Sequence, residues 1–239
     1  MINRREFFRV IGLGSLRLIY PFYPGEQYKR RAQANALENE EVVVKANFAD
    51  QDSIAQFDFV PDYENFFNIT KDGTKDSVLA IKEIGPLLNN PRRPRTYAVL
   101  KDYLWRKAEI TVDVRYTHSL GTPDVIIPFA YQDANNWYYV HVSNKSDGFH
   151  NVIMKVHGSD RHTVHTMRNR APLQNTEYYT LKVVFDTTTG SVEVYCNDNG
   201  MEEPFLVGQD KVMNPGFVGI GSFDTYAFFH NFTVRGELV

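Results

Sequence analysis

The sequence predicts an all-β fold in which two antiparallel sheets pack face to face as a sandwich. From about residue 40 onward, apolar and polar residues alternate in short segments with the period of two that is typical of β-strands. Turn residues separate these segments, notably at 186–190 and 197–200, where Asp, Asn and Gly supply the positive φ of hairpin turns. We expect no amphipathic helix beyond one turn near Ala34–Glu40. Many short strands with frequent turns indicate a sandwich or barrel.

Each expected strand is an alternating run bounded by turn residues. In chain order they are Val42–Phe48, Gln56–Val60, Phe66–Thr70, Ser77–Lys82, Thr96–Leu100, Glu109–His118, Asp124–Tyr131, Trp137–Ser143, Asn151–His157, Tyr179–Asp186, Ser191–Cys196, Phe217–Phe223 and Phe228–Arg235. Further turns are expected at Asp72–Gly73 and Asp147–Gly148. The run 124–131 is apolar on both faces, which predicts a central strand covered by another layer.

The alternation also predicts which side chains face the core. We expect the apolar sets to point inward: Ile110, Val112, Val114 and Tyr116, then Tyr138, Val140 and Val142, then Val152, Met154 and Val156. If consecutive strands are neighbours, the opposite sets share one outer face. That face carries Asp113, Arg115, Tyr139, His141, Asn151, Lys155 and His157, and it is the predicted functional site.

The chain divides into a short leader, residues 1–36, and one sandwich domain, residues 37–239. The stretch Asn3–Arg9 resembles a twin-arginine export signature, with two arginines, one intervening residue and then apolar residues. Ala32-Gln33-Ala34 offers small residues for a signal peptidase, although Arg17 interrupts the apolar stretch. The leader predicts a periplasmic or secreted protein; a disordered basic tail or a misassigned start is the alternative.

Composition narrows the classes of partner. A formal charge of −3, with no basic cluster inside the folded part, argues against nucleic acid. Cys196 is the single cysteine, so no intrachain disulfide forms, which is compatible with a bacterial periplasm. No apolar run is long enough to span a bilayer. The length is sufficient for a core that needs neither a disulfide nor a metal.

Three segments resemble concanavalin A-like lectin and glucanase jelly rolls. They are the cluster Ala134–Ser143 with its continuation His150–Gly158, and the closing pair Gly216–Phe223 and Phe229–Val234. The closing pair is similar to the end of laminin G-like and 3-keto-disaccharide hydrolase domains. The resemblance extends over roughly residues 56–239 and implies a two-sheet antiparallel jelly-roll sandwich that faces a carbohydrate. Lectins, hydrolases and lyases all use this fold, so the resemblance leaves the activity open.

The chemistry that fits these residues is elimination rather than two-carboxylate hydrolysis. The Glu-x-Asp-x-x-Glu motif of laminarinase-type enzymes is absent. A 3-keto glycoside or a uronate needs a positioned base and acid with a cationic stabiliser. His141 and Tyr139 are therefore the candidate catalytic pair, with Arg115 or Lys155 as the electrophile and Asn151, His157 and Asp113 as substrate-binding residues.

Several of these residues have simpler explanations that remain open. Arg115 and Lys155 could merely pair with Asp113 and Glu109 across strands. Trp137 and Tyr139 either form a platform for a pyranose or close the core. The arginine-rich segment Arg92–Tyr97 is either a wall of a groove for an anionic sugar or, as we favour, a solvated loop.

No cofactor is expected, and no metal at the histidines, because their spacing does not match a zinc site. A structural Ca²⁺ is compatible with the fold family, with Asp58 or Asp147 as oxygen donors, but no ligand is assigned.

Three functions fit the sequence. The first is an exported carbohydrate-active protein that binds a polysaccharide or oligosaccharide, with a variant that cleaves a modified glycoside. The second is a non-catalytic lectin-like module, and the third is a structural or adhesive surface protein. Neither the enzymatic activity nor the oligomeric state follows from the sequence.

Overall fold

A computed structural model describes residues 41–168 and 171–239, which belong to one compact unit spanning Glu38–Val239. The leader and the helical turn expected at Ala34–Glu40 lie outside these residues. The described chain is almost entirely β-structure in antiparallel sheets, so the predicted all-β jelly-roll sandwich is confirmed. Within the described residues, no helix has the length and apolar character needed to cross a membrane.

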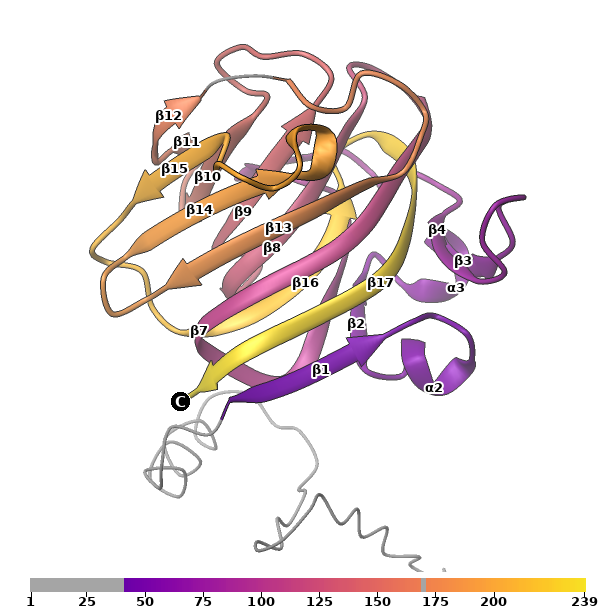
Figure 1. Ribbon diagram of the computed structural model, residues 1–239, viewed down its shortest axis with the longest axis horizontal. Coiled ribbons are helices and arrows are strands. Elements are labelled where there is room, and N and C mark those ends of the chain that lie inside the picture. The colour runs from indigo at the N-terminus through magenta and orange to yellow at the C-terminus, as the bar shows by residue number, and fades with distance from the viewer. Residues whose placement is uncertain (1–40, 169–170) are drawn as a thin grey trace, which may run out of the picture. The chain divides into compact units, whose positions relative to one another are not determined.

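Two layers of strands face each other in Figure 1. One layer runs in the order β12 (His165–Arg168), β15 (Leu206–Gln209), β14 (Ser191–Cys196), β13 (Tyr179–Asp186), the second half of β7 (Thr96–Ser119) and β17 (Thr225–Leu238). The start of β17 also pairs with β4 (Val78–Ile81), which pairs with β3 (Phe67–Thr70), and the rest of β17 pairs with β1 (Val42–Ala46). This layer is called the β13 layer below.

The other layer is called the β8 layer. Its order is β11 (His162–Thr163), β10 (Val152–His157), β9 (Asn136–Ser143), β8 (Asp124–Asp133), β16 (Gly216–Ser222), the first half of β7 and β2 (Phe57–Val60). Because β7 takes part in both layers, its hydrogen bonds join them into one continuous path. Four short elements complete the fold: α2 (Gln51–Ile54), α3 (Tyr63–Phe66), the 3-10 turn η1 (Asn197–Asn199) and a separate hairpin of β5 (Leu88–Asn89) and β6 (Arg92–Arg93).

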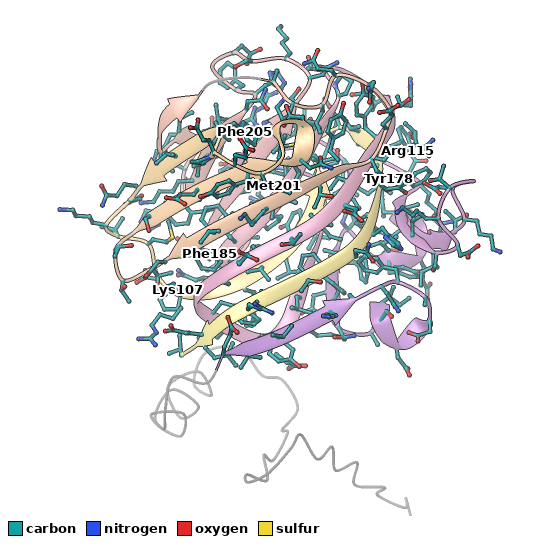
Figure 2. All side chains as sticks on the ribbon, in the orientation of Figure 1. Lys107, Arg115, Tyr178, Phe185, Met201 and Phe205 are labelled. Atoms are coloured by element: carbon teal, nitrogen blue, oxygen red, sulfur yellow. The ribbon has the colours of Figure 1, made fainter. Side chains whose placement is uncertain are left out.

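The main core lies between the two layers. The inward residues of β7 and β13, such as Val112 and Val183, pack against the inward residues of β8 and β9, such as Ile127 and Val140. Phe129 of β8 and Phe185 of β13 meet across the layers with ring centroids 5.4 Å apart, and Figure 2 labels Phe185 within this packing. Burial of such side chains is the dominant stabilising contribution in a fold of this size.

A second apolar cluster covers the opposite face of the β8 layer. It contains Tyr97 and Val99 of β7, Ile126 of β8, Trp137 and Tyr139 of β9, Val152, Met154 and Val156 of β10, and Phe217 of β16. Successive side chains of a strand point to opposite faces of the sheet. Residues next to members of this cluster, such as Ala98, Ile127 and Val140, therefore belong to the main core. The β8 layer is therefore buried on both faces, as the run 124–131 predicted for its central strand β8.

Candidate functional site

The second cluster supplies the floor of the candidate site. The pairing of β9 with β10 sets Trp137 opposite Val156, Tyr139 opposite Met154 and His141 opposite Val152. The aromatic rings of β9 follow one another along this face, with 5.1 Å between the centroids of Trp137 and Tyr139 and 6.2 Å between those of Tyr139 and His141. An aromatic row therefore extends along β9 to the His141 end of the strand.

Two arginines from different loops converge at that end, over the ring of Phe223. The guanidinium carbon of Arg161 lies 4.3 Å from the Phe223 centroid, and that of Arg92 lies 5.7 Å from it. His141 stacks on the same ring with centroids 6.1 Å apart. We name this group the arginine site; its members are Arg92, Arg161, Tyr139, His141, Phe149 and Phe223.

Arg161 is held between two aromatic rings. Besides Phe223, the ring of Phe149 lies 5.6 Å from its guanidinium carbon, and Phe149 is 61% exposed. Nη1 of Arg161 donates a hydrogen bond of 3.2 Å to the Tyr139 hydroxyl. Within the described residues this is its one hydrogen-bond partner, so most of the five N–H donors of the guanidinium remain for a ligand or water.

The second arginine comes from the β5–β6 hairpin, whose turn holds a cis peptide bond at Asn90–Pro91. The backbone N–H of Arg92 donates to Asp160 in the segment that leads to Arg161, at 2.8 Å. Nη1 of Arg93 donates to the Asn135 side chain at 3.3 Å, and Nε of Arg95 donates to the Phe223 carbonyl at 2.8 Å. The arginine-rich segment is therefore fixed against the β8 layer, and our expectation of a solvated loop is wrong.

A buried ion pair lies beneath the arginine site. Nε2 of His141 is 3.2 Å from Oδ2 of Asp124, and both side chains are 2% exposed. Oδ1 of Asp124 accepts hydrogen bonds from the Ser222 hydroxyl and the Phe223 N–H. Burial alone raises the pKa of Asp124, but the hydrogen bond and charge of His141 hold it below its ordinary value. The pair fixes the end of β16 that carries Phe223.

A second carboxylate, Asp224, lies at this end of the sheet. Burial, followed by the nearby charge of Asp124, raises its pKa above the ordinary value. Its nearest cation is Arg95, whose Nη2 is 3.9 Å from Oδ2 of Asp224. Arg95 is therefore engaged by Asp224, whereas Arg92 and Arg161 have no carboxylate partner among the described residues.

The predicted common outer face is not formed. Tyr139 lies in the second cluster and His141 lies at its edge. Their side chains are buried, with 0% and 2% of their surface exposed. Asn151 is also fully buried, with a positive φ of 54°, and its side chain bonds to the backbone of Ser143 and Lys145. It closes the β9–β10 connection rather than facing outward.

Lys155 and His157 lie on the face opposite to Tyr139 and His141. The register pairs Lys155 with Tyr138 and His157 with Asn136, so both point to the main-core side of β10, at its edge. Nζ of Lys155 is 2.8 Å from Oδ2 of Asp210, which also accepts from the Tyr138 hydroxyl, and His157 is exposed. We expected Val152, Met154 and Val156 to share the face of Tyr138; the observed register places them with Tyr139 instead.

Asp113 and Arg115 do share one face, as predicted, but it belongs to the β13 layer and is paired within the fold. Asp113 accepts hydrogen bonds from Thr180 at 2.7 Å and Asn231 at 2.9 Å. Nη1 of Arg115 is 3.1 Å from Oδ2 of Asp72, and the Tyr178 hydroxyl donates to the same oxygen. Figure 2 labels Arg115 and Tyr178 beside the segment between β3 and β4.

Among the described residues, no three His, Cys, Asp or Glu side chains come together in a group that could hold a metal. Asp58, considered as a calcium donor, lies 3.5 Å from Nζ of Lys101. Oδ1 of Asp147 is used by the N–H groups of Phe149 and His150 and by the His150 ring. Asp147 therefore orders the turn that carries Phe149.

Sequence reasoning missed Phe149, Arg161 and Phe223. Each lies at the end of a strand or in a connection, where alternation gives no direction. The arginine-rich segment 92–97 was the one available signal, since it sits beside no compensating acidic run.

Known structures resemble this fold, although no known family profile and no curated protein matches the sequence. The carbohydrate-binding module CBM66 from Bacillus subtilis is similar over 76% of this chain and 96% of its own, with 16% identity and a TM-score of 0.55. Winged bean acidic lectin is similar over 84% of this chain and 100% of its own, with 10% identity and a TM-score of 0.55. The GH43 protein BlXynB from Bacillus licheniformis is similar over 80% of this chain and 39% of its own, with 13% identity and a TM-score of 0.57. These likenesses show that the chain has a lectin-like jelly-roll fold.

Proposed function

We propose that this chain is a carbohydrate-binding protein that holds its saccharide at the arginine site. The observation that carries the proposal is the environment of Arg161, where an exposed ring, Phe149, lies beside a guanidinium with uncommitted donors. A pyranose needs both, because its C–H face packs on an aromatic ring while its hydroxyls seek hydrogen bonds. The fold adds support, since its structural relatives include a carbohydrate-binding module and a lectin complexed with methyl-α-D-galactose.

A glycan array followed by isothermal titration calorimetry tests this proposal. Phe149→Ala should weaken binding about tenfold, which corresponds to ~1.4 kcal/mol, because the stacking surface is lost. Val212→Ala is the matched control, since Val212 is also an exposed apolar residue, at 64%, but lies outside the arginine site. Absence of binding to every neutral and charged glycan on the array would overturn the proposal.

A second candidate is an enzyme that eliminates a leaving group from a 3-keto glycoside or a uronate. The contact that favours it is the Tyr139 hydroxyl against Arg161. Burial raises the pKa of Tyr139 to about 12, and the charge of Arg161 offsets only part of that rise. The phenol therefore keeps its proton at neutral pH and suits a general acid, but the predicted base, His141, is already paired with Asp124.

Burial is the observation against catalysis. Tyr139 and His141 are almost fully buried, so a substrate would reach them only after the side chains above them move. Binding is therefore the better supported function. If the protein is an enzyme, Tyr139→Phe should abolish turnover, whereas glycan binding should weaken only in part through the lost hydrogen bond to Arg161. A wild-type protein that binds a glycan and forms no product would exclude the enzymatic function.

We also propose that the protein is exported to the periplasm or secreted. The support is the sequence of the leader, with Arg4 and Arg5 followed by Phe7 and Phe8. Residues 1–36 fused to a folded reporter should direct it out of the cytoplasm of a bacterium with twin-arginine transport. Replacing Arg4 and Arg5 together by Lys should retain the reporter inside, and equal export of both fusions would contradict a twin-arginine route.

A further inference from the structure

The arginine site concentrates positive charge on one aromatic ring. Arg92 and Arg161 come from segments 69 positions apart in the sequence, yet the guanidinium carbons of both lie within 6 Å of the Phe223 centroid. Like charges brought together repel one another, and the repulsion is stronger beside a low-dielectric aromatic surface than in water. A site of this kind is stabilised when a negative charge enters it.

Asp160 and Asp124 lie near the arginine site, but neither forms an ion pair with Arg92 or Arg161. No carboxylate oxygen of a described residue lies within 4 Å of the guanidinium of Arg92 or Arg161. Asp160 accepts the backbone N–H of Arg92 rather than its side chain. Asp124 is occupied by His141, and Asp224 faces Arg95 at 3.9 Å.

The backbone of Arg92 and the side chain of Arg161 are also held in place. The Arg92–Asp160 bond joins the β5–β6 hairpin to the segment that carries Arg161, and Tyr139 fixes one end of the Arg161 guanidinium. Rings on both sides of Arg161 restrict its rotation. A planar guanidinium fixed in this way is suited to bind an oxyanion through two parallel hydrogen bonds.

From this geometry we infer that the saccharide bound at the arginine site carries an anionic oxygen group, a carboxylate or a sulfate ester, which Arg92 and Arg161 bind together. The inference rests on the proposed carbohydrate-binding function and adds the class of ligand. Phe149 then packs on the ring of the sugar, and the two guanidinium groups bind its acidic substituent. A neutral saccharide would leave the two arginines uncompensated and should bind more weakly.

Matched ligands test the inference on the purified full chain. Isothermal titration calorimetry would compare an oligouronate with its fully methyl-esterified form, which keeps the sugar, linkage and size but lacks the charge, and with a sulfated oligosaccharide. The acid or the sulfated ligand should bind at least tenfold more tightly than the ester. The preference should weaken as salt is raised, because ion pairs at partly exposed sites are screened.

Single substitutions distinguish the contribution of the two arginines of the site from a general effect of the net charge of the protein. Arg161→Gln and Arg92→Gln should each weaken binding of the anionic ligand at least tenfold and reduce its preference over the ester. Arg235→Gln is the control: it removes the same charge from an exposed arginine of β17 that lies 3.7 Å from Glu41, and binding should stay within twofold of wild type. Thermal unfolding of each variant checks that the fold is retained.

The outcomes distinguish the inference from the proposed function. Equal binding of acid and ester, binding of neutral glycans alone, or wild-type affinity in both arginine variants overturns the anionic ligand while leaving carbohydrate binding intact. A preference for the sulfated ligand that depends on Arg161 supports the inference and identifies the anion as sulfate. No binding of any glycan overturns the proposed function and the inference with it.

Discussion

Arg115 and Arg161 have closely similar aromatic surroundings in two different parts of the sandwich. The guanidinium carbon of Arg115 lies 5.9 Å from the Tyr178 centroid and 5.5 Å from that of Phe228, much as Arg161 lies between Phe149 and Phe223. The difference is the carboxylate. Asp72 lies against Arg115 with a fully buried side chain, whereas no described acidic residue lies against Arg161.

The comparison shows how a stacked arginine can serve two purposes. At Arg115 the positive charge is neutralised within the fold by Asp72. Together with Tyr178, this contact holds the segment between β3 and β4 against the β13 layer. At Arg161 the stacking positions a charge that the described chain leaves uncompensated. A stacked arginine is therefore a candidate binding residue only when its charge has no internal partner.

The largest expected effect on stability comes from breaking the pair of His141 and Asp124 beneath the arginine site. His141→Leu removes the partner of a buried carboxylate and should lower the free energy of unfolding by about 3–5 kcal/mol, as is typical of broken buried ion pairs. Chemical denaturation measures it.

A double variant sharpens this result. Asp124→Asn with His141→Leu should recover part of the loss, since the uncompensated charge is then gone as well. A loss below ~1 kcal/mol in the single variant would mean that His141 is not an important partner of Asp124.

The next largest effect on stability is expected from replacing Asp72, the carboxylate that neutralises Arg115. Asp72→Asn should lower the free energy of unfolding by about 1.5–3 kcal/mol at neutral pH, the usual contribution of hydrogen bonds to a charged group. Asp76→Asn is the control, since Asp76 pairs with Lys71 at 3.8 Å on a fully exposed surface and its replacement should change little. Equal effects of both substitutions would contradict the structural role of Asp72.

This contribution should depend on pH in a definite direction. Burial alone raises the pKa of Asp72, but hydrogen bonds from Tyr178, Thr74 and Lys75 outweigh it and hold the pKa well below its usual range. The folded carboxylate therefore stays ionised where the unfolded one takes up a proton, near pH 4. The stabilisation is complete above that pH and is lost as the pH falls toward the lower folded pKa. The difference between wild type and Asp72→Asn should shrink in acid; a constant difference would contradict the lowered pKa.

The sequence predicted most strands because alternation and turn chemistry agree. Tyr179–Asp186 and Ser191–Cys196 are observed with the predicted bounds, and Gly190 between them has a φ of 73° and no room for a Cβ, which would lie 2.1 Å from the Asp210 carbonyl. The strand β7 was predicted as two because charged residues interrupt its pattern near Asp102, which has a φ of 70°. A turn was expected at Asp147–Gly148, and the positive φ of this connection is found at Asn151.

The site was harder to predict because the β8 layer is buried on both faces. In such a layer alternation identifies two sets of side chains but cannot tell which set faces the main core. Val152 and Met154 look like core residues, and they are buried, but in the second cluster beside Tyr139. The contacts of Arg161 join a loop, a turn and a strand end, and these depend on tertiary packing that a local pattern does not contain.

The smallest effect on stability tests the comparison most directly. Arg161→Gln should lower the free energy of unfolding by about 1 kcal/mol or less, because it removes the hydrogen bond to the buried Tyr139 hydroxyl but leaves no described carboxylate without its cation. Arg115→Gln should cost about 1–2 kcal/mol, since it leaves the buried Asp72 without its cation. Denaturant unfolding of both variants at the same pH and salt measures the difference. If Arg161→Gln cost as much as Arg115→Gln, then its charge would be engaged in the fold after all, and the contrast between the two arginines would disappear. If it raised stability slightly, relief of repulsion from Arg92 would be the physical reason.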